Sequence, residues 1–349
     1  MTKLYNDILN QTEQLEKSLL NILQYPELLK EACGLIAGSD HLYITGIGAS
    51  LNAGLAIQNS FLRFGLPALV VDSSELLYYH PMPYNSTVIF LSRSGESIEI
   101  VKLLEKVKSE GAKTIGITNK VEGTLALNVD VCLPTATDFD FSISISTYSS
   151  IILIGNILAL CYFNKIKEHD KEELISALKT VAGMLDGWYE KIKSSDWLNN
   201  SAFTYFLGRG AGMATCNGAR LLWEEAAKCP ANAINTSNFR HGPQEILGKD
   251  FRIGISLDAD TMVEEDIRLI KDMRSLGVKV LVTGQNIEHD LGDLTFQIPA
   301  VNSVFQPIFD IIPYQLAAEH LAHLSNNDCD SFRYCSFVVT SEVGITSNN

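Results

Sequence analysis

The stretch Tyr-Ile-Thr-Gly-Ile-Gly-Ala at residues 43–49 returns later in the chain as Tyr-Phe-Leu-Gly-Arg-Gly-Ala at residues 205–211. A second pair of stretches, residues 101–113 and 267–279, keeps its apolar residues, one glycine and a final lysine in the same order. The sequence therefore predicts two copies of one unit of roughly 150 residues, which is a common domain size.

The two copies differ at one place that bears on function. Residues 91–97 of the first copy read Leu-Ser-Arg-Ser-Gly-Glu-Ser, whereas residues 257–260 of the second read Leu-Asp-Ala-Asp. Hydroxyl groups can donate hydrogen bonds to an anion, but ionised carboxylates only accept them. We therefore expect an anion-binding loop in the first copy alone, and a different ligand chemistry in the second.

Short apolar runs alternate with segments of helical period throughout the chain. This alternation predicts parallel sheets covered by helices on both faces. The expected fold class is α/β, with two doubly wound parallel sheets in tandem, each a three-layer α/β/α, flavodoxin-like domain, and an N-terminal helix. The predicted strands are residues 42–45, 68–71, 87–91, 114–118 and 129–133, then 203–208, 231–235, 252–257, 279–283 and 294–298.

Five consecutive segments are expected along the chain. They are an N-terminal helical segment at 1–38, a first sheet domain at 39–165, a connecting helix at 166–198, a second sheet domain at 199–330 and a C-terminal tail at 331–349. The tail is polar and aromatic without a clear period, so it either frays or folds over a site.

Composition and charge exclude several classes of function. The net charge of −14 argues against binding to nucleic-acid phosphates, which requires clustered Lys and Arg. Seven cysteines without a Cys-x-x-Cys pair are typical of free thiols in a reducing compartment. Residues 1–30 lack signal-peptide character, and the longest apolar stretch, 151–163, is too short to cross a membrane. We expect a soluble, cytoplasmic protein that binds neither nucleic acid nor membrane.

Two loops of the first copy are suited to bind an anion. In a doubly wound sheet the ligand lies at the carboxyl ends of the strands, where loops enter helix N-termini. Residues 46–52 follow the first predicted strand, and residues 92–97 follow the third. Glycines in the first loop allow close backbone approach, and Ser50 and Ser97 are expected to cap the next helices. Serine hydroxyls and a helix N-terminus can together hold a phosphate without a lysine.

Two details of these loops bear on which class of ligand they can bind. The first loop does not carry a dinucleotide fingerprint, because the bulky Leu51 occupies the position of the third glycine. Arg93 in the second loop either adds a charge-assisted bond to the phosphate or faces outward. The sequence leaves these two orientations of Arg93 open.

The second copy supplies groups that can move protons. Residues 223–225 read Trp-Glu-Glu on a predicted helix, and His241 lies in a stretch Phe-Arg-His-Gly-Pro. A carboxylate and an imidazole are the usual pair for moving a proton between adjacent carbons. Burial against Trp223 is expected to raise the pKa of Glu225. Spacing alone does not pair Glu225 with His241.

These residues resemble a known family, the tandem SIS (sugar isomerase) domain proteins, and the resemblance implies one SIS domain at 39–165 and a second at 199–330. Residues 91–97 look like the sugar-phosphate-binding loop of SIS (sugar isomerase) domains, usually written S-x-S-G-x-T/S. Residues 208–243 resemble the isomerase half of glucosamine-6-phosphate synthase, and the resemblance extends over residues 42–342. It implies that Glu225, not Glu224, shuttles the proton and that His241 assists ring opening. The residues expected to bind the substrate phosphate are Gly48, Ser50, Ser92, Arg93, Ser94 and Ser97.

The chain also departs from the synthase pattern. It has no cysteine-led glutaminase domain at its N-terminus, so we expect no release of ammonia from glutamine. Residues 330–333 look like the family's Asp-x-Pro-Arg turn, but Phe337 stands where the synthase has a substrate-binding lysine. A Schiff base to fructose 6-phosphate is therefore not expected.

The resemblance implies a phosphosugar isomerase-type enzyme that acts on a ketose, aldose or amino-sugar 6-phosphate through an enediol or enolamine, without a metal or organic cofactor. One alternative is a fructosamine 6-phosphate deglycase, because those enzymes share the Phe-Arg-His-Gly-Pro-x-Glu-Ile stretch of residues 239–246. A second alternative is a sensor that binds a sugar phosphate without turnover. Family members place the histidine across a subunit boundary, which implies a homodimer with a shared active site.

Overall fold

The computed structural model describes residues 1–167, 169–198 and 203–342. Its contacts divide the chain into two compact units. The N-terminal unit comprises residues 13–171 and the chain from Phe332 onward, and the C-terminal unit comprises residues 1–12 and 172–331. The units are not consecutive, in contrast to the expected segments, because the first residues pack with the second half of the chain and the tail packs with the first.

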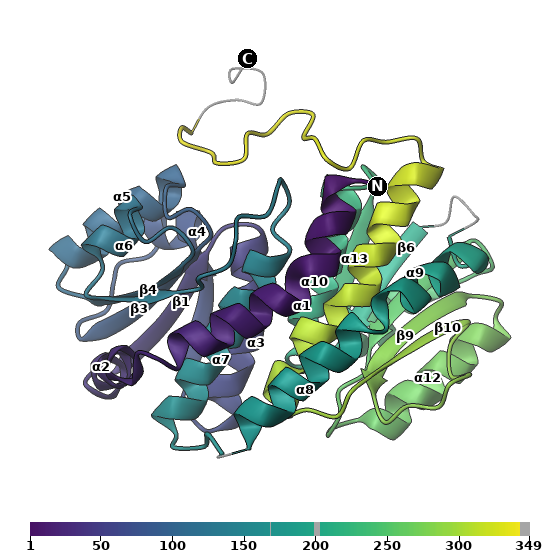
Figure 1. Cartoon of the computed structure of the whole chain (residues 1–349), viewed down its shortest axis with the longest axis horizontal. Helices are drawn as coiled ribbons and strands as arrows, with labels where there is room; N and C mark the ends of the chain where they lie inside the picture. The colour runs from purple at the N-terminus through teal and green to yellow at the C-terminus, as the bar shows by residue number, and fades with distance from the viewer. Residues whose placement is uncertain (168, 199–202, 343–349) are drawn as a thin grey trace. The chain divides into compact units, whose positions relative to one another are not determined.

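The N-terminal unit contains a parallel five-stranded sheet in the order β2-β1-β3-β4-β5. One face is covered by α2, α3 and α7, and the other by α4, α5 and α6 (Figure 1). Gly155 lets α7 approach α3, since a Cβ there would lie 2.2 Å from Cδ1 of Ile57. The strands are β1 (His41–Gly46), β2 (Ala68–Asp72), β3 (Ser86–Ser92), β4 (Lys113–Thr118) and β5 (Val131–Pro134). The helices are α2 (Pro26–Ala37), α3 (Ala49–Arg63), α4 (Ser73–Tyr78), α5 (Ile98–Ser109), α6 (Thr124–Asn128) and α7 (Ser146–Tyr162).

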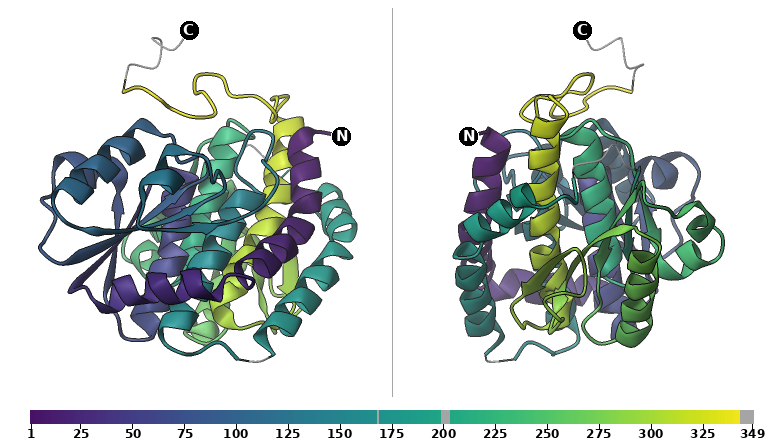
Figure 2. Two further views of the ribbon diagram at one scale, coloured as in Figure 1. Left: turned by 60° about the vertical axis from the view of Figure 1, so that its left-hand side comes forward. Right: turned by 90° about the vertical axis from the view of Figure 1, so that its right-hand side faces the viewer.

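The C-terminal unit contains a second parallel five-stranded sheet, in the order β7-β6-β8-β9-β10. Helices α9, α10 and α13 cover one face, and α11 and α12 cover the other (Figure 2). The strands are β6 (Phe203–Gly208), β7 (Ala231–Asn235), β8 (Phe251–Ser256), β9 (Lys279–Gln285) and β10 (Leu294–Ile298). The helices are α8 (Asp170–Ala182), α9 (Leu185–Ser194), α10 (Gly212–Glu225), α11 (Thr236–Arg240), η1 (Pro243–Ile246), α12 (Val263–Ser275), η2 (Ser303–Phe305) and α13 (Gln306–Leu324).

The predicted α/β fold is confirmed. All ten predicted strands occur, and both sheets have the same order of strands along the chain. The order reverses between β1 and β3 in one sheet and between β6 and β8 in the other, so each sheet has one switch point where a ligand can lie.

The predicted connecting helix is wrong in one respect. Instead of one helix, α8 and α9 occur, and the break falls at Gly183 and Met184. Glycine loses more conformational entropy in a helix than any other residue, so an interruption there costs little. The apolar stretch at residues 151–163 forms most of α7, which is largely buried.

Two further expectations can be compared with the structure. All seven cysteines are free thiols, as the odd, scattered set predicts. Over residues 1–167, 169–198 and 203–342, no helix combines the length and apolar character that a membrane span requires.

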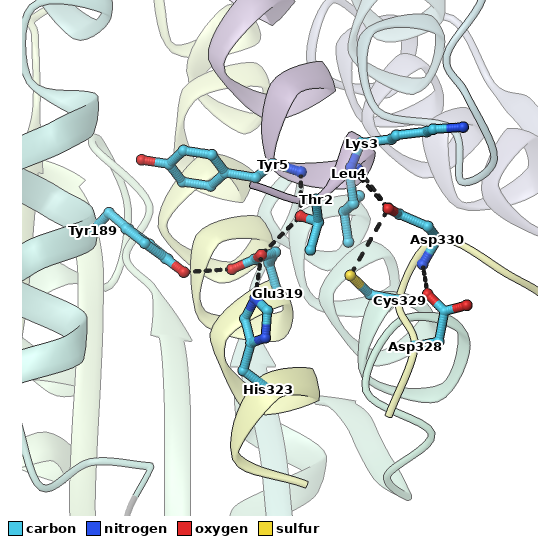
Figure 3. A network of polar contacts seen from close by, with 10 residues as sticks. All are labelled: Thr2, Lys3, Leu4, Tyr5, Tyr189, Glu319, His323, Asp328, Cys329 and Asp330. Atoms are coloured by element: carbon cyan, nitrogen blue, oxygen red, sulfur yellow. Dashed lines mark hydrogen bonds and ion pairs between the residues drawn. The ribbon is translucent and has the colours of Figure 1, made fainter. Parts of the chain in front are cut away.

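The first turn of α1 (Lys3–Ile22) is held within the C-terminal unit by two carboxylates (Figure 3). The buried Glu319 of α13 accepts hydrogen bonds from Thr2 Oγ1 at 2.8 Å and from Tyr189 Oη at 2.6 Å. Asp330 accepts from the backbone N–H groups of Lys3 and Leu4, both at 2.8 Å. Because the N–H groups of a first helical turn have no partner within the helix, Asp330 supplies the missing acceptors.

Candidate functional site

The loop from β1 to α3 depends on two glycines. A Cβ on Gly46 would lie 3.0 Å from both Leu51 N and Leu91 O, so only glycine lets α3 begin this close to the sheet. Gly48 has φ 57° and ψ −123°, a conformation that residues with a side chain rarely adopt. Gly48 is also the N-cap of α3, and Ser50 lies inside the first turn. The expectation that Ser50 caps this helix is therefore wrong, because the helix begins two residues earlier than a Ser50 N-cap requires.

Residues 92–97, the serine loop, join β3 to α5. Ser92 Oγ accepts a hydrogen bond from Gly95 N at 3.0 Å, and Ser94 Oγ accepts from Glu96 N at 3.2 Å. These bonds fold the loop while each hydroxyl proton stays available for another acceptor. Ser97 is the N-cap of α5, but its side chain makes no capping hydrogen bond, in contrast to the expectation. The loop therefore presents hydroxyl groups at a helix N-terminus beside the β1/β3 switch point.

Glu96 anchors the serine loop to the start of α6. Its carboxylate accepts hydrogen bonds from Thr124 N at 3.0 Å and Thr124 Oγ1 at 2.7 Å, at the first turn of α6. Lys120 Nζ lies 3.6 Å away. The hydrogen bonds from Thr124, and then the charge of Lys120, lower the pKa of Glu96. The one carboxylate of this loop is thus used as a structural anchor.

Gly95→Ala is expected to destabilise the protein by about 1–2 kcal/mol more than Gly111→Ala. Both glycines have positive φ, 70° and 83°, so both substitutions introduce backbone strain of about 1 kcal/mol. Only at Gly95 does the new Cβ also collide, at 2.8 Å from Leu125 Cβ, whereas nothing lies within 4 Å at Gly111. Urea unfolding of the two variants measures the difference. Equal losses would show that α6 moves away at no cost.

Arg93 does not face outward. Its Nη1 donates to Ser142 O at 2.7 Å, and its Nη2 donates to Phe337 O at 3.1 Å. The guanidinium carbon lies 5.7 Å from the centroid of the Phe139 ring. Arg93 therefore joins the serine loop to the loop before α7 and to the tail, a set of contacts that the sequence did not predict.

The described part of the tail lies on α5 and does not fray. Ile98 N, in the first turn of α5, donates to Val339 O at 3.0 Å. Farther along, Glu342 pairs with Lys102 and accepts from the hydroxyl of Tyr78. Of the two alternatives for the tail, the structure supports folding over a predicted binding loop.

Glu225 is the last residue of α10 and is partly exposed. Trp223 packs in the core, with its ring centroid 4.9 Å from Phe206 and 6.0 Å from Trp197. Side chains two positions apart on a helix do not face each other, so Trp223 does not bury Glu225 as expected. Lys228 Nζ donates to the carbonyls of Glu225, Asp328 and Ser331 at 2.6–2.8 Å, and so ties the end of α10 to the turn at 328–331.

His241 follows α11 directly and is exposed. Its backbone N–H donates to Asn238 O at 3.1 Å, and Gly242 next to it has φ 146°. Beside this segment, a cavity of about 500 Å³ lies between residues 240–247 and α12. The imidazole is thus presented to solvent from the surface of the C-terminal unit.

In the C-terminal unit, the charged side chain of the loop between β6 and α10 (residues 208–211) is paired within the protein. Arg209 makes two hydrogen bonds through Nε and Nη2 to the buried Asp266, at 2.9 Å each. After β8, Asp258 Oδ1 accepts from Asp260 N at 2.9 Å and from Thr261 N at 2.8 Å. In this unit a carboxylate takes the N–H groups that could otherwise meet an anion, which fits the predicted difference between the two copies.

Sequence reasoning missed one buried carboxyl group, which lies beside the carboxyl end of β8. Asp310 of α13 accepts from Ser256 Oγ at 2.5 Å and from Gln306 Nε2 at 2.9 Å, while its Oδ1 has no partner within the described chain. Burial raises the pKa of Asp310 to about 7, more than its hydrogen bonds lower it. The sequence signal was an acidic residue within the apolar run Pro307–Pro313 of α13.

Comparison with known proteins bears on the family of the first sheet. The sequence profile described as SIS domain matches residues 35–160. This part of the chain is similar to SIS domains. The match contains the β1–α3 loop, the serine loop and Arg93, so these candidate residues all lie inside the matched region.

Relatives extend the similarity beyond the SIS domain match. The glutamine–fructose-6-phosphate aminotransferase [isomerizing] of Pyrococcus horikoshii is 26% identical over 346 residues, which covers 93% of this chain and 57% of the relative. The chain therefore spans little more than half the length of that relative. This similarity covers almost the whole chain. It therefore includes Glu225 and His241, which lie outside the SIS domain match.

Solved structures share the fold of the whole chain. The C-terminal domain of glucosamine-fructose-6-phosphate aminotransferase from Francisella tularensis superposes with a TM-score of 0.83 at 20% identity, covering 95% of this chain and 98% of that one. Glucosamine-6-phosphate deaminase from Thermotoga maritima gives 0.80 at 21% identity, covering 97% and 99%. At these identities the likeness concerns the fold.

Proposed function

We propose that this protein is a phosphosugar isomerase-type enzyme that acts on a ketose, aldose or amino-sugar 6-phosphate. The serine loop carries the proposal, because it presents hydroxyl groups and a helix N-terminus at the switch point of a sheet that is similar to SIS domains. Gly48, Ser50, Ser92, Ser94 and Ser97 are the proposed phosphate contacts. The names of the relatives, which concern fructose 6-phosphate and glucosamine 6-phosphate, support a hexose 6-phosphate.

The motif suggests that Arg93 is only a phosphate contact, but we propose an additional structural role. Two of its N–H groups already meet the carbonyls of Ser142 and Phe337. We propose that it contributes positive charge to the phosphate while holding the two flanking segments in place.

The proposed chemistry is proton transfer between C1 and C2. Glu225 takes the proton from one carbon and returns it to the other through an enediol or enolamine, and His241 assists opening of the sugar ring. The partial exposure of Glu225 supports this role, since a carboxylate that meets substrate must be reachable. The exposure of His241 supports the proposal of a homodimer, in which the imidazole can serve a second copy.

Deglycation of a fructosamine 6-phosphate is a second candidate, and Phe337 favours it. This residue replaces the lysine by which the synthase pattern binds a ketose, and its ring packs on Phe141 and Phe332. In that reaction the same proton transfer turns the C2 ketone and C1 amine into a C1 imine and a C2 alcohol. Water then adds at C1 and the C1–N bond breaks, giving an aldose 6-phosphate and a free amine.

Incubation with fructose 6-phosphate in D2O tests the proposal. If Glu225 moves a proton between C1 and C2, deuterium from solvent is expected in the recovered hexose 6-phosphate, as measured by mass spectrometry. Fructoselysine 6-phosphate, supplied separately, reports deglycase activity by the release of lysine. Binding of both compounds without deuterium uptake or lysine release would contradict an enzymatic function.

A further inference from the structure

Three phenylalanine side chains, Phe141, Phe332 and Phe337, pack on one another in the N-terminal unit. Arg93, which donates to the carbonyl of Phe337, lies over a fourth ring, Phe139, and we call these four residues the phenylalanine cluster. The rings of Phe141 and Phe337 lie 6.5 Å apart between centroids, and those of Phe332 and Phe337 lie 5.7 Å apart. Phe139, Phe141 and Phe337 are 54%, 43% and 53% exposed. Single exposed apolar side chains are ordinary, but several gathered from two distant segments mark a binding surface.

Arg93 connects the phenylalanine cluster to the serine loop. Arg93 is a member of that loop, and its guanidinium lies over Phe139 while it donates to the carbonyl of Phe337. The tail also bonds directly to the first turn of α5, through Ile98 N and Val339 O. The proposed phosphate contacts and the cluster are therefore continuous parts of one surface in one unit.

We propose that the substrate carries an apolar group, linked to C1 through nitrogen, and that the phenylalanine cluster binds this group. The inference rests on the proposed function, since it takes the serine loop as the phosphate site. The substrate class is then the 6-phosphofructosyl adduct of an amino acid with an apolar side chain, such as phenylalanine or leucine. Water cleaves its C1–N bond as described for deglycation, and the amino acid leaves.

Charge selects an apolar adduct over the lysine adduct. Ring faces attract cations, but the face of Phe139 already has the Arg93 guanidinium 5.7 Å from its centroid. A second cation, the ammonium group of a lysine adduct, is repelled there. An amino-acid carboxylate, in contrast, is attracted by the same guanidinium. Apolar side chains gain from contact with the exposed rings in proportion to the area they remove from water.

Three chemically prepared adducts test the inference on the full chain. The 6-phosphofructosyl adducts of phenylalanine, glycine and lysine are compared by the kcat/KM for amino-acid release. We expect the phenylalanine adduct to exceed the glycine adduct by at least about tenfold, which corresponds to ~1.4 kcal/mol. The lysine adduct is expected to rank below the phenylalanine adduct.

Two variants test whether the phenylalanine cluster causes the preference for the phenylalanine adduct. Phe337→Ala and Phe141→Ala, one from each segment of the cluster, are expected to bring the phenylalanine-to-glycine ratio close to one. Tyr84→Ala is the matched control, because Tyr84 is an aromatic residue of the same unit that is 92% exposed. It should leave the ratio as in the wild type. Thermal unfolding of each variant separates a lost preference from lost folding.

The outcomes distinguish this inference from the proposed function. Equal kcat/KM values for the phenylalanine and glycine adducts, or a preference for lysine, would overturn the inference. Isomerisation of hexose 6-phosphate without cleavage of any adduct would also overturn it, and would leave the isomerase function standing. If neither hexose 6-phosphate nor any adduct binds, measured by calorimetry, the proposed phosphate site itself fails.

Discussion

Replacing Glu225 by Gln is expected to slow deuterium exchange into hexose 6-phosphate by about 10³-fold, with little change in KM. Gln keeps the shape of the side chain at the end of α10 but cannot take a proton. A positioned acid or base contributes roughly 10²–10⁴-fold to such a step, and only in the transition state. Saturating and subsaturating rates in D2O separate the effect on kcat from the effect on KM.

The neighbouring glutamate provides the control. Glu224 lies on the same helix, is exposed and pairs with Arg220 one turn earlier. An ion pair of this kind contributes only about 0.3–0.5 kcal/mol, so Glu224→Gln should leave both exchange and stability nearly unchanged. Full exchange by Glu225→Gln, or an equal loss in Glu224→Gln, would remove Glu225 from the mechanism.

Asp310→Asn is expected to stabilise the protein at high pH and to change little at low pH. Burial raises the pKa of Asp310 from 3.8 to about 7, so the folded state binds this proton more tightly than the unfolded state does. Its contribution is fully present below about pH 4 and is lost as the pH rises toward 7. At about 1.4 kcal/mol for each pH unit between the two values, the wild type loses up to about 4 kcal/mol, which the neutral amide avoids.

The groups around Asp310 come from several elements of the C-terminal unit. Ser256 of β8 and Gln306 of α13 stabilise the charged form by donating hydrogen bonds, the nearby Thr283 of β9 also lowers the pKa of Asp310, and Asp258 opposes the charged form by its own negative charge. Cys216 of α10 and Tyr314 of α13 also face this carboxyl group, and burial raises the pKa of both. With no described cation among these neighbours, desolvation dominates.

Urea unfolding of wild type and variant between pH 4 and pH 9 measures this effect. The difference between the two proteins isolates Asp310 from the other titrating groups. Asp272→Asn, at an exposed position of the same unit, is the control, because it removes a carboxylate that is not buried. A wild type that is as stable as Asp310→Asn at pH 9 would show that the buried carboxylate is compensated.

The sequence by itself determined the elements and the location of the candidate loops. Alternating apolar runs predicted every strand, because the pattern of burial along a strand or helix is written in consecutive residues. The repeat and the serine motif placed the candidate anion-binding loop in the first copy, at the end of β3.

Only the tertiary structure decided what each functional side chain meets. Arg93 contacts the carbonyl of Phe337, 244 positions away, and Ile98 N meets Val339 O in the same tail. Asp310 became a buried acid only when α13 packed against the ends of β8 and β9. Periodicity records how much of a residue is buried but not which distant residue buries it. The pairing of distant segments, and with it the pKa of Asp310 and the surroundings of Arg93, arises only when the chain folds.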